Sequence, residues 1–326
     1  MLVRTPRFTS TFCSCKSKIM HILLTGARGM VGQNLLEHPG IKKFRVTSLS
    51  RDDLDLRDAR LVEGFMHHAK PDLVIHAAGK VGGIQANILE PSSFMLENIQ
   101  IGCNIVNASR KYGVKRLINL GSSCMYPRGH CNSLSEELLL TGELEPTNEG
   151  YALAKIAVSK LCEYISHENS EYQYKTLLPC NLYGKYDKFD PKHSHLVPSI
   201  IRKIYAAKIN GEKTVDIWGD GTARREFMYA GDLADAIVST IDRFEDAPTI
   251  MNIGLGYDYS VNEYYQNVAN VIGFEGSFSH NLAKPVGMKR KLLNISRQTS
   301  WGWSPKVSLA EGIRTTYNFF LENIQK

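Results

Sequence analysis

The sequence predicts an α/β fold in which a doubly wound parallel sheet is joined to a second, smaller α/β lobe. Short β-branched runs alternate with helix-length segments from Met20 onward. A glycine-rich turn follows the first of these runs directly, and the alternation weakens after Pro179. Strands interleaved with helices form βαβ units, so we expect a parallel sheet first and a less regular lobe after it.

Each element follows from the spacing of apolar residues. Two long segments repeat apolar residues at helical spacing, 94–112 and 151–168, and a third helical pattern covers 232–244. Residues 181–194 and the turn at 219–221 are rich in loop-forming residues, whereas the run 251–253 is suited to rejoin the sheet. The strands expected in the sheet are the short apolar runs 21–24, 45–49, 72–76, 116–120 and 175–178.

The composition is that of an ordinary globular protein, with 326 residues of which 43% are hydrophobic and 22% charged. No apolar run approaches the ~18 residues that a membrane-spanning helix needs. Most of the net charge of +6 lies in residues 1–18, which contain no acidic residue. We expect this segment to be a disordered tail or a targeting segment. Because the remainder is nearly neutral, we expect no nucleic acid as a partner, and because no run is long enough to span a bilayer, we expect no membrane as a partner. A cytoplasmic location is expected, with organelle targeting left open by the first 18 residues.

The seven cysteines are irregularly spaced and lack the paired spacing of a zinc site. Reduced thiols and no bound metal are therefore expected.

The turn after the first expected strand has the spacing Gly26-x-x-Gly29-x-x-Gly32. Glycines at these positions let backbone N–H groups and a helix N-terminus approach a pyrophosphate. The position of this turn after the first strand of a βαβ alternation gives the motif its weight. The sequence thus predicts a Rossmann-type, dinucleotide-binding sheet.

The end of the second expected strand predicts which dinucleotide binds. An acid there holds the ribose 2′-hydroxyl of NAD, whereas an arginine receives the 2′-phosphate of NADP. The strand ends at Arg51, and Arg28 lies inside the glycine turn. Because two arginines can clamp a phosphate by charge-assisted hydrogen bonds, the predicted cofactor is NADP(H). A solvated surface charge is the alternative interpretation of Arg51.

Three polar residues predict a site that reduces a ketone. Tyr151 and Lys155 are four residues apart and so share a helix face. A nearby cation lowers the pKa of a phenol and suits it to act as the general acid for a carbonyl that receives hydride. Ser122 follows the fourth expected strand, where a parallel sheet places its ligand, and its hydroxyl can bond the same carbonyl oxygen.

These residues resemble the extended short-chain dehydrogenase/reductase family, whose members modify nucleotide sugars. The resemblance runs from about Met20 to the C-terminus and is closest to the branch that acts on GDP-4-keto-6-deoxy-D-mannose. The matching segments occur in order, as Lys80-Val-Gly-Gly-Ile84, Gly121-Ser-Ser-Cys-Met-Tyr-Pro127, Glu145-Pro-Thr-Asn-Glu149, Asn181-Leu-Tyr-Gly184, Ser194-His-Leu-Val-Pro198, Trp218 to Phe227, Leu292-Leu293 and Trp301-Gly-Trp-Ser-Pro305.

The resemblance implies an enzyme that epimerises this GDP-sugar at carbons 3 and 5 and then reduces carbon 4 with NADPH, giving GDP-L-fucose. It assigns the reduction to Ser122, Tyr151 and Lys155, and the proton exchange of the epimerisation to Cys124 and His195. Protons next to a ketone are acidic, and a thiol and an imidazole titrate near neutrality. Without the resemblance, a small buried thiol and a structural histidine are the simpler interpretations.

The resemblance also implies binding residues and an assembly. A homodimer is expected through the helices that contain Asn98 and Tyr164. Two departures from the pattern, Lys188 and Val286, put nearby nucleotide or sugar contacts in doubt. The contacts with GDP are assigned to Lys203, Trp218 and Arg225. The contacts with the cofactor are assigned to Gly26, Arg28, Gly29, Met30, Val31, Gly32, Arg51, Lys155, Asn181, Leu182 and His195.

Two other functions stay open at this point. One is an NAD-dependent nucleotide-sugar epimerase or dehydratase on the same fold, which Arg28 and Arg51 disfavour. The other is a non-catalytic NADP-binding module, which the combination of Ser122, Tyr151 and Lys155 disfavours. Because the run 251–253 is expected to return to the sheet, the domain boundary should be discontinuous. An NADP-binding domain is predicted for 19–180 with 225–255, and a substrate-binding domain for 181–224 with 256–326.

Overall fold

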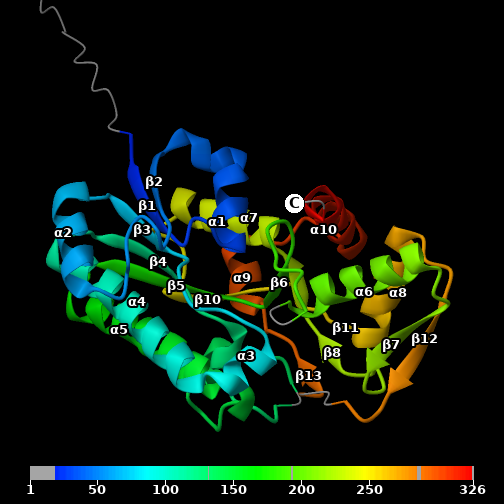
Figure 1. Cartoon of the computed structure of the whole chain (residues 1–326). Coiled ribbons are helices and arrows are strands. Elements are labelled where there is room, and N and C mark those ends of the chain that lie inside the picture. The colour runs from blue at the N-terminus through cyan, green and yellow to red at the C-terminus, as the bar shows by residue number, and fades with distance from the viewer. Residues whose placement is uncertain (1–18, 131, 192–193, 285–287, 325–326) are drawn as a thin grey trace, which may run out of the picture.

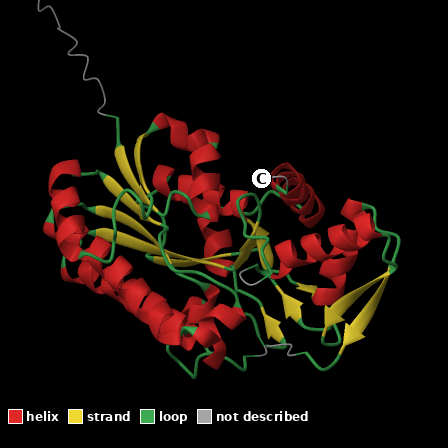
Figure 2. Cartoon of the chain, viewed as in Figure 1, coloured by secondary structure: helices red, strands yellow, loops and turns green. Residues whose placement is uncertain are grey.

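The computed structural model describes residues 19–130, 132–191, 194–284 and 288–324. The predictions for residues 1–18 and for Val286 lie outside these residues. A parallel sheet with helices on both faces stands beside a smaller lobe of short strands and helices (Figure 1; Figure 2). The predicted α/β class, with a Rossmann-type sheet and a smaller second α/β lobe, is confirmed.

The main sheet has six strands in the order β10-β5-β4-β3-β1-β2, and every neighbouring pair is parallel. Each run predicted as a strand of this sheet is one, with ends that differ by at most two residues. The run at 250–253 does return to the sheet, as its far edge. The bounds are β1 His21–Thr25, β2 Arg45–Leu49, β3 Leu73–His76, β4 Arg116–Leu120, β5 Gln173–Pro179 and β10 Ile250–Ile253.

The sheet is buried on both faces, which explains why its strands are continuous apolar runs. Along β1, Leu23 packs into one core while Ile22 and Leu24 pack into another on the opposite face. Helix α1 (Met30–Glu37) packs against α7 (Ala230–Asp242) over one face. The other face is covered by α2 (Ala59–Ala69), α4 (Pro91–Lys111) and α5 (Glu149–Glu168). None of the described helices is both long and apolar enough to cross a membrane.

The smaller lobe has its own apolar core beneath α6 (Leu196–Asn210), α8 (Val261–Ile272) and α10 (Leu309–Asn323). Its strands form three small sheets, β12-β7, β6-β9 and β11-β8-β13. The loop-rich segment 181–194 therefore contains a short strand that the sequence did not predict. The remaining bounds are β6 Asn181–Tyr183, β7 Thr214–Trp218, β8 Arg224–Arg225, β9 Phe227–Tyr229, β11 Tyr259–Ser260, β12 Ser277–Asn281, β13 Arg290–Lys291, α3 Ile84–Leu89 and α9 Ser296–Trp301.

The two lobes are joined by chain segments that cross more than once. After β13 the chain returns to the first lobe, where Leu293 and Trp303 pack into the same core as α1 and α7. The carboxylate of Glu226 accepts hydrogen bonds from the backbone N–H groups of Leu255, Gly256 and Leu293, at 2.6, 3.0 and 2.9 Å. The exact division into two domains stays a prediction.

The glycine turn between β1 and α1 lies so close to neighbouring backbone that two of its positions have no room for a side chain. Gly26 has a φ of +71°, and a Cβ atom there would lie 2.7 Å from the backbone of Ala77 and Ala78. A Cβ at Gly32 would lie 2.4 Å from the carbonyl oxygen of Gly26. Gly26 must be glycine because the turn lies against the backbone that follows β3, and Gly32 must be glycine because α1 lies against the turn itself.

We expect Gly26→Ala to destabilise the fold by about 3 kcal/mol, because it adds steric overlap to the cost of a left-handed backbone. Gly113→Ala is the matched control, since Gly113 also has a positive φ, +75°, but nothing lies within 4 Å of its added Cβ. The control should lose only about 1–2 kcal/mol. Equal losses in urea unfolding would show that crowding at Gly26 is unimportant.

Candidate functional site

The predicted site residues gather at the carboxyl edge of the main sheet, where a parallel sheet binds its ligand. Gly26 follows β1, Arg51 follows β2 and Ser122 follows β4. Segments of the smaller lobe face this edge. A Cβ at Gly83, in the loop after β3, would lie 3.6 Å from the carbonyl oxygen of Ser194.

The glycine turn fits a dinucleotide pyrophosphate. Gly29 is the N-cap residue of α1 and provides no side chain to cover the backbone N–H groups of the first turn, which includes Met30 and Val31. The first turn of α1 carries no acidic residue. Such a helix start attracts anions through its N–H groups and its dipole, and the crowded backbone at Gly26 and Gly32 keeps side chains out of the approach.

Beyond the turn, arginines and acids alternate at the end of β2. Arg28 pairs with Asp52, and the side chains of Arg28 and Arg51 are 67% and 70% exposed. A guanidinium nitrogen of Arg51 lies 3.9 Å from Glu97, which also lies 3.5 Å from Arg57. Both predicted arginines are thus accessible to a ligand and held by carboxylates on the protein.

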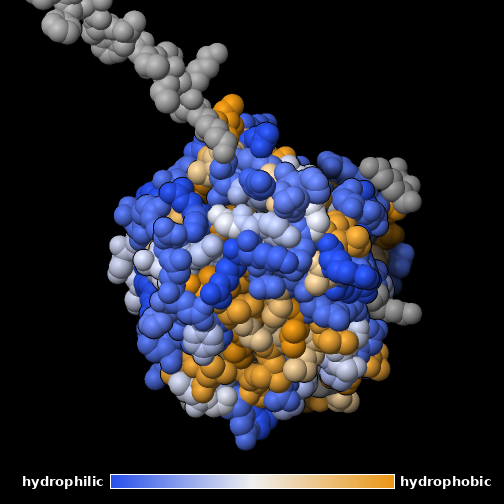
Figure 3. All heavy atoms as spheres, turned by 90° about the vertical axis from the view of Figure 1, so that its left-hand side faces the viewer, coloured by the Kyte–Doolittle hydropathy of each residue, from blue (hydrophilic) through white to orange (hydrophobic). Residues whose placement is uncertain are grey.

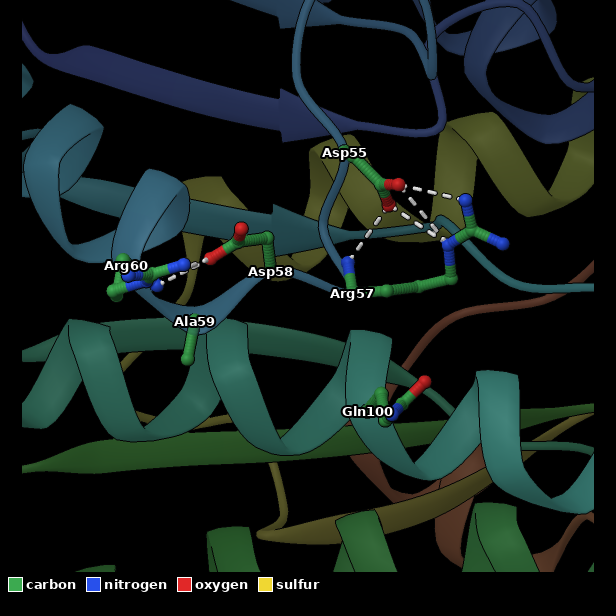
Figure 4. Close-up of a pocket in the computed structure, with 6 residues that line it drawn as sticks. All are labelled: Asp55, Arg57, Asp58, Ala59, Arg60 and Gln100. Atoms are coloured by element: carbon green, nitrogen blue, oxygen red, sulfur yellow. Dashed lines mark hydrogen bonds and ion pairs between the residues drawn. The ribbon is translucent and has the colours of Figure 1, made fainter.

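Arg57 is a third arginine at this end of the sheet, and the sequence did not predict it. It lies in a surface hollow with Asp55 and Gln100, its guanidinium turned toward Asp55 at 2.7 Å (Figure 4). Hydrogen bonds from Arg57 lower the pKa of Asp55 to about 2. The position of Arg57 in the short loop after Arg51 was the one feature of the sequence that could have indicated a role. Basic residues in loops are too common for that feature to predict a binding site.

Tyr151 and Ser122 lie together, close enough for the Ser122 hydroxyl to act on the pKa of the Tyr151 phenol. The expected lowering of the Tyr151 pKa by Lys155 is wrong for this structure. Burial raises the pKa of Tyr151 above its ordinary value, the nearby Cys124 adds to the rise, and the Ser122 hydroxyl opposes it. Tyr151 therefore keeps its proton at neutral pH, which suits a proton donor.

Lys155 is buried beneath this pair and points back to the sheet. Its Nζ lies 5.9 Å from the centre of the Tyr151 ring and donates to the carbonyl oxygen of Leu120 at 2.8 Å. Burial lowers the pKa of Lys155 to about 8, so the ammonium still dominates at neutral pH. The neighbouring His76 is held neutral, because burial and the charge of Lys155 lower its pKa to about 3.

Asn98 shapes the loop beside Lys155. Its side-chain amide accepts from the backbone N–H of Lys80 at 2.9 Å and donates to the Lys80 carbonyl at 3.0 Å. A Cβ at Gly79 would lie 2.8 Å from Asn98 and 3.7 Å from the Nζ of Lys155. This part of the site therefore depends on a buried amide, for which the sequence predicted only a place on a dimer helix.

Two nitrogen donors from distant parts of the chain lie close to the sulfur of Cys124. The side-chain amide of Asn148 donates to it at 3.1 Å, and the Nζ of Lys291 lies 3.6 Å away. Neither residue was predicted. Lys291 directly precedes the Leu292-Leu293 pair of the resemblance, which was its only signal, whereas Asn148 lies inside the matching segment before Tyr151.

His195 is the N-cap residue of α6. The pKa of His195 lies below its ordinary value, because surrounding protein displaces water from the ring and because the charge of Lys188 repels a second positive charge. Within the described part of the chain, no hydrogen bond links His195 to Ser122, Cys124 or Tyr151. Lys188, which departs from the pattern of the resemblance, thus lowers the pKa of the predicted site residue His195.

Two of the residues expected to bind GDP, Lys203 and Trp218, are in contact, and the third, Arg225, is on a neighbouring segment of the chain. Lys203 stands 5.4 Å from the ring centre of Trp218, which is 43% exposed, and Lys284 stands 5.2 Å from it. Lys203 also pairs with Asp216 at 3.1 Å. Arg225 is on β8, where burial lowers its pKa and Glu145 opposes the change.

The remaining predicted residues line the junction between the lobes. Asn181, at the start of β6, donates to the carbonyl oxygen of Glu226 at 3.0 Å. The adjacent Leu182 is half-buried and packs against the core of the first lobe. A contact of either residue with a cofactor stays a prediction.

Comparison with known proteins agrees with this arrangement. The chain is 52% identical to a GDP-L-colitose synthase of Yersinia pseudotuberculosis, over 93% of this chain and 98% of that protein. It is 49% identical to a GDP-L-fucose synthase of Azorhizobium caulinodans, over 92% and 96%. A GDP-mannoheptose C4 reductase from Campylobacter jejuni, solved with NADP bound, superposes with a TM-score of 0.84 at 33% identity, covering 93% and 98%.

The family model for the NAD dependent epimerase/dehydratase family matches residues 22–254. These residues include the glycine turn, the hydroxyl pair of Ser122 and Tyr151, and the strand that returns to the sheet. The chain therefore belongs to the NAD dependent epimerase/dehydratase family, as its resemblance to the extended short-chain dehydrogenases predicts.

Proposed function

We propose that this chain is an NADP-dependent enzyme that epimerises a GDP-4-keto-6-deoxyhexose and reduces its ketone at carbon 4. The observation that carries the proposal is the cluster at the end of β4, where Ser122, Tyr151 and Cys124 meet beside the buried Lys155. A protonated phenol and a hydroxyl suit a developing alkoxide, and a thiol beside them suits proton exchange at the neighbouring carbons. The related GDP-sugar synthases and reductases support the same class of substrate.

The reduction needs a hydride, which bound NADPH supplies. Arg28 and Arg51 would hold its 2′-phosphate, the start of α1 would hold its pyrophosphate, and Lys155 and Asn181 would contact the rest of the cofactor. Ser122 hydrogen-bonds the ketone oxygen, and Tyr151 gives that oxygen its proton as it becomes a hydroxyl. Cys124 and His195 exchange protons with the carbons next to the ketone. Lys203, Trp218 and Arg225 contact the GDP group.

The finer proposal is that the substrate is GDP-4-keto-6-deoxy-D-mannose and the product GDP-L-fucose. A second candidate follows from the 52% identity to a GDP-L-colitose synthase. L-colitose lacks the 3-hydroxyl of L-fucose, so this alternative needs a 3-deoxy substrate and inversion at carbon 5 alone. The predicted residues serve either substrate, because both have an acidic C–H group beside the ketone.

The two candidates predict different rates with defined substrates. We expect the purified protein, given NADPH, to convert GDP-4-keto-6-deoxy-D-mannose at least tenfold more efficiently than its 3-deoxy counterpart, with GDP-L-fucose identified by NMR. Cys124→Ser should then lose the incorporation of deuterium from heavy water, by about 10²–10⁴ in rate. The reverse preference would favour the colitose-type activity. No NADPH oxidation with either sugar would contradict the proposal as a whole.

Cofactor selection gives a separate prediction. We expect the wild type to bind NADPH more tightly than NADH, and Arg51→Ala to lose about 1.5–3 kcal/mol of NADPH binding, because a charge-assisted contact with the 2′-phosphate disappears. Arg60→Ala is the matched control, since Arg60 is an exposed arginine at the start of α2. Fluorescence titrations with both cofactors measure the change. An unchanged NADPH-to-NADH ratio in Arg51→Ala would remove Arg51 from the site.

We also propose that the protein is a homodimer through α4 and α5. Large apolar side chains gather on this side of the molecule (Figure 3). On α4 and α5, Met95, Leu96, Leu153 and Tyr164 are 38%, 58%, 37% and 58% exposed. Exposed apolar patches of this kind mark interfaces. The domain division given above, with NADP in the first lobe and the sugar in the second, belongs to the same proposal.

The oligomeric state tests the dimer directly. We expect wild type to have the mass of two chains in light scattering, and Leu96→Glu to have the mass of one, because the substitution buries a charge in the interface. Leu282→Glu is the control, since Leu282 is 74% exposed but lies in the smaller lobe. A monomeric wild type would contradict the assembly.

A further inference from the structure

The small sheet β11-β8-β13 directs two cations toward the first lobe. Strands β8 and β13 are parallel, with Arg224 beside Arg290 and Arg225 beside Lys291. Neighbouring side chains along a strand point to opposite faces. Arg224 and Arg290 both bind the buried carboxylate of Asp258, at 2.6 and 2.5 Å. The side chains of Arg225 and Lys291 therefore lie on the opposite face of the small sheet from Asp258.

The side chain of Lys291 contacts Cys124 across the two lobes. Its Nζ lies 3.6 Å from the sulfur although the two residues are 167 positions apart in sequence. Asn148 donates to the same sulfur at 3.1 Å. An ammonium and an amide donor directed at one sulfur are the surroundings of a reactive cysteine, because they stabilise the negative charge of a thiolate.

The other cysteines that the structure describes lie in different surroundings. Burial raises the pKa values of Cys103, Cys162 and Cys180, as expected of thiols packed as small hydrophobic groups. Within residues 19–130, 132–191, 194–284 and 288–324, Cys124 is the cysteine whose sulfur lies in contact with a lysine. The contact thus singles out one thiol.

We propose that Lys291 is a positioning residue for proton exchange, whose ammonium stabilises the negative charge that the Cys124 sulfur carries when it acts as a base. In the step, the thiolate takes the proton from a carbon next to the ketone. The C–H bond breaks, an S–H bond forms, and the electron pair moves to the ketone oxygen beside Ser122 and Tyr151. The charge that Lys291 balanced thus passes to the oxygen that these hydroxyls stabilise.

This inference rests on the proposed function for the exchange step, but the state of the thiol is measured without any substrate. Iodoacetamide alkylates thiolates, and peptide mass spectrometry counts the product at Cys124. We expect Lys291→Met and Lys291→Gln to slow alkylation of Cys124 at neutral pH by roughly tenfold. Lys291→Arg should restore most of the rate, because it returns the positive charge.

The matched control is Lys289→Met, which removes the same charge from an exposed residue two positions earlier. In this variant Cys124 should be alkylated at the same rate as in wild type. Thermal unfolding and NADPH binding check that each variant is folded, and having two neutral variants keeps the test valid if one is not. Unchanged alkylation of Cys124 in a folded neutral variant would overturn the proposal.

A second measurement separates this role from a structural one. With GDP-4-keto-6-deoxy-D-mannose and oxidised cofactor in heavy water, the neutral variants should lose deuterium incorporation by at least tenfold, while NADPH affinity stays within twofold of wild type. Equal loss in Lys291→Arg would show that charge is not what matters and would contradict the role. If wild type itself exchanges no deuterium, the proposed substrate fails, and the alkylation result still decides the inference about Lys291.

Discussion

The buried carboxylate of Glu226 fixes the junction on which the candidate site depends. One of its oxygens accepts from Leu255 and Gly256, just after β10, and the other accepts from Leu293, just after β13. A buried carboxylate without such partners would be strongly destabilising. Burial raises the pKa of Glu226 to about 7, against these three hydrogen bonds that lower it. The same carboxylate therefore binds the chain just after β10 and just after β13, the strand that carries Lys291.

This junction explains how residues far apart in sequence meet. Arg225 directly precedes Glu226, and Lys291 lies two residues before Leu293. Asp258 holds their neighbours, Arg224 and Arg290, from the other face of the small sheet. The smaller lobe thus presents cations at fixed positions, whereas the first lobe supplies the hydroxyl groups and the thiol. A site of this kind exists only when both lobes are packed together.

Electrostatics divides the site into two parts. At the end of β2, exposed arginines pair with carboxylates that a phosphate can replace, because exposed ion pairs contribute little to stability. Around β4 the groups are buried, and burial moves the pKa values of Tyr151 and Lys155 away from their ordinary values. The first part suits recognition of a charged ligand, and the second suits proton transfer.

The sequence by itself determined the parallel sheet, the glycine turn and the pairing of Tyr151 with Lys155. Each depends on neighbours close in the chain: apolar runs for buried strands, Gly26 and Gly32 for a crowded turn, and a four-residue spacing for one helix face. Tertiary structure decided which residues reach the same place from distant segments, including Lys291 and Asn148 at Cys124, and Arg57 at Glu97. It also decided the protonation of Tyr151, because burial depends on what packs over the ring, and no local pattern records that.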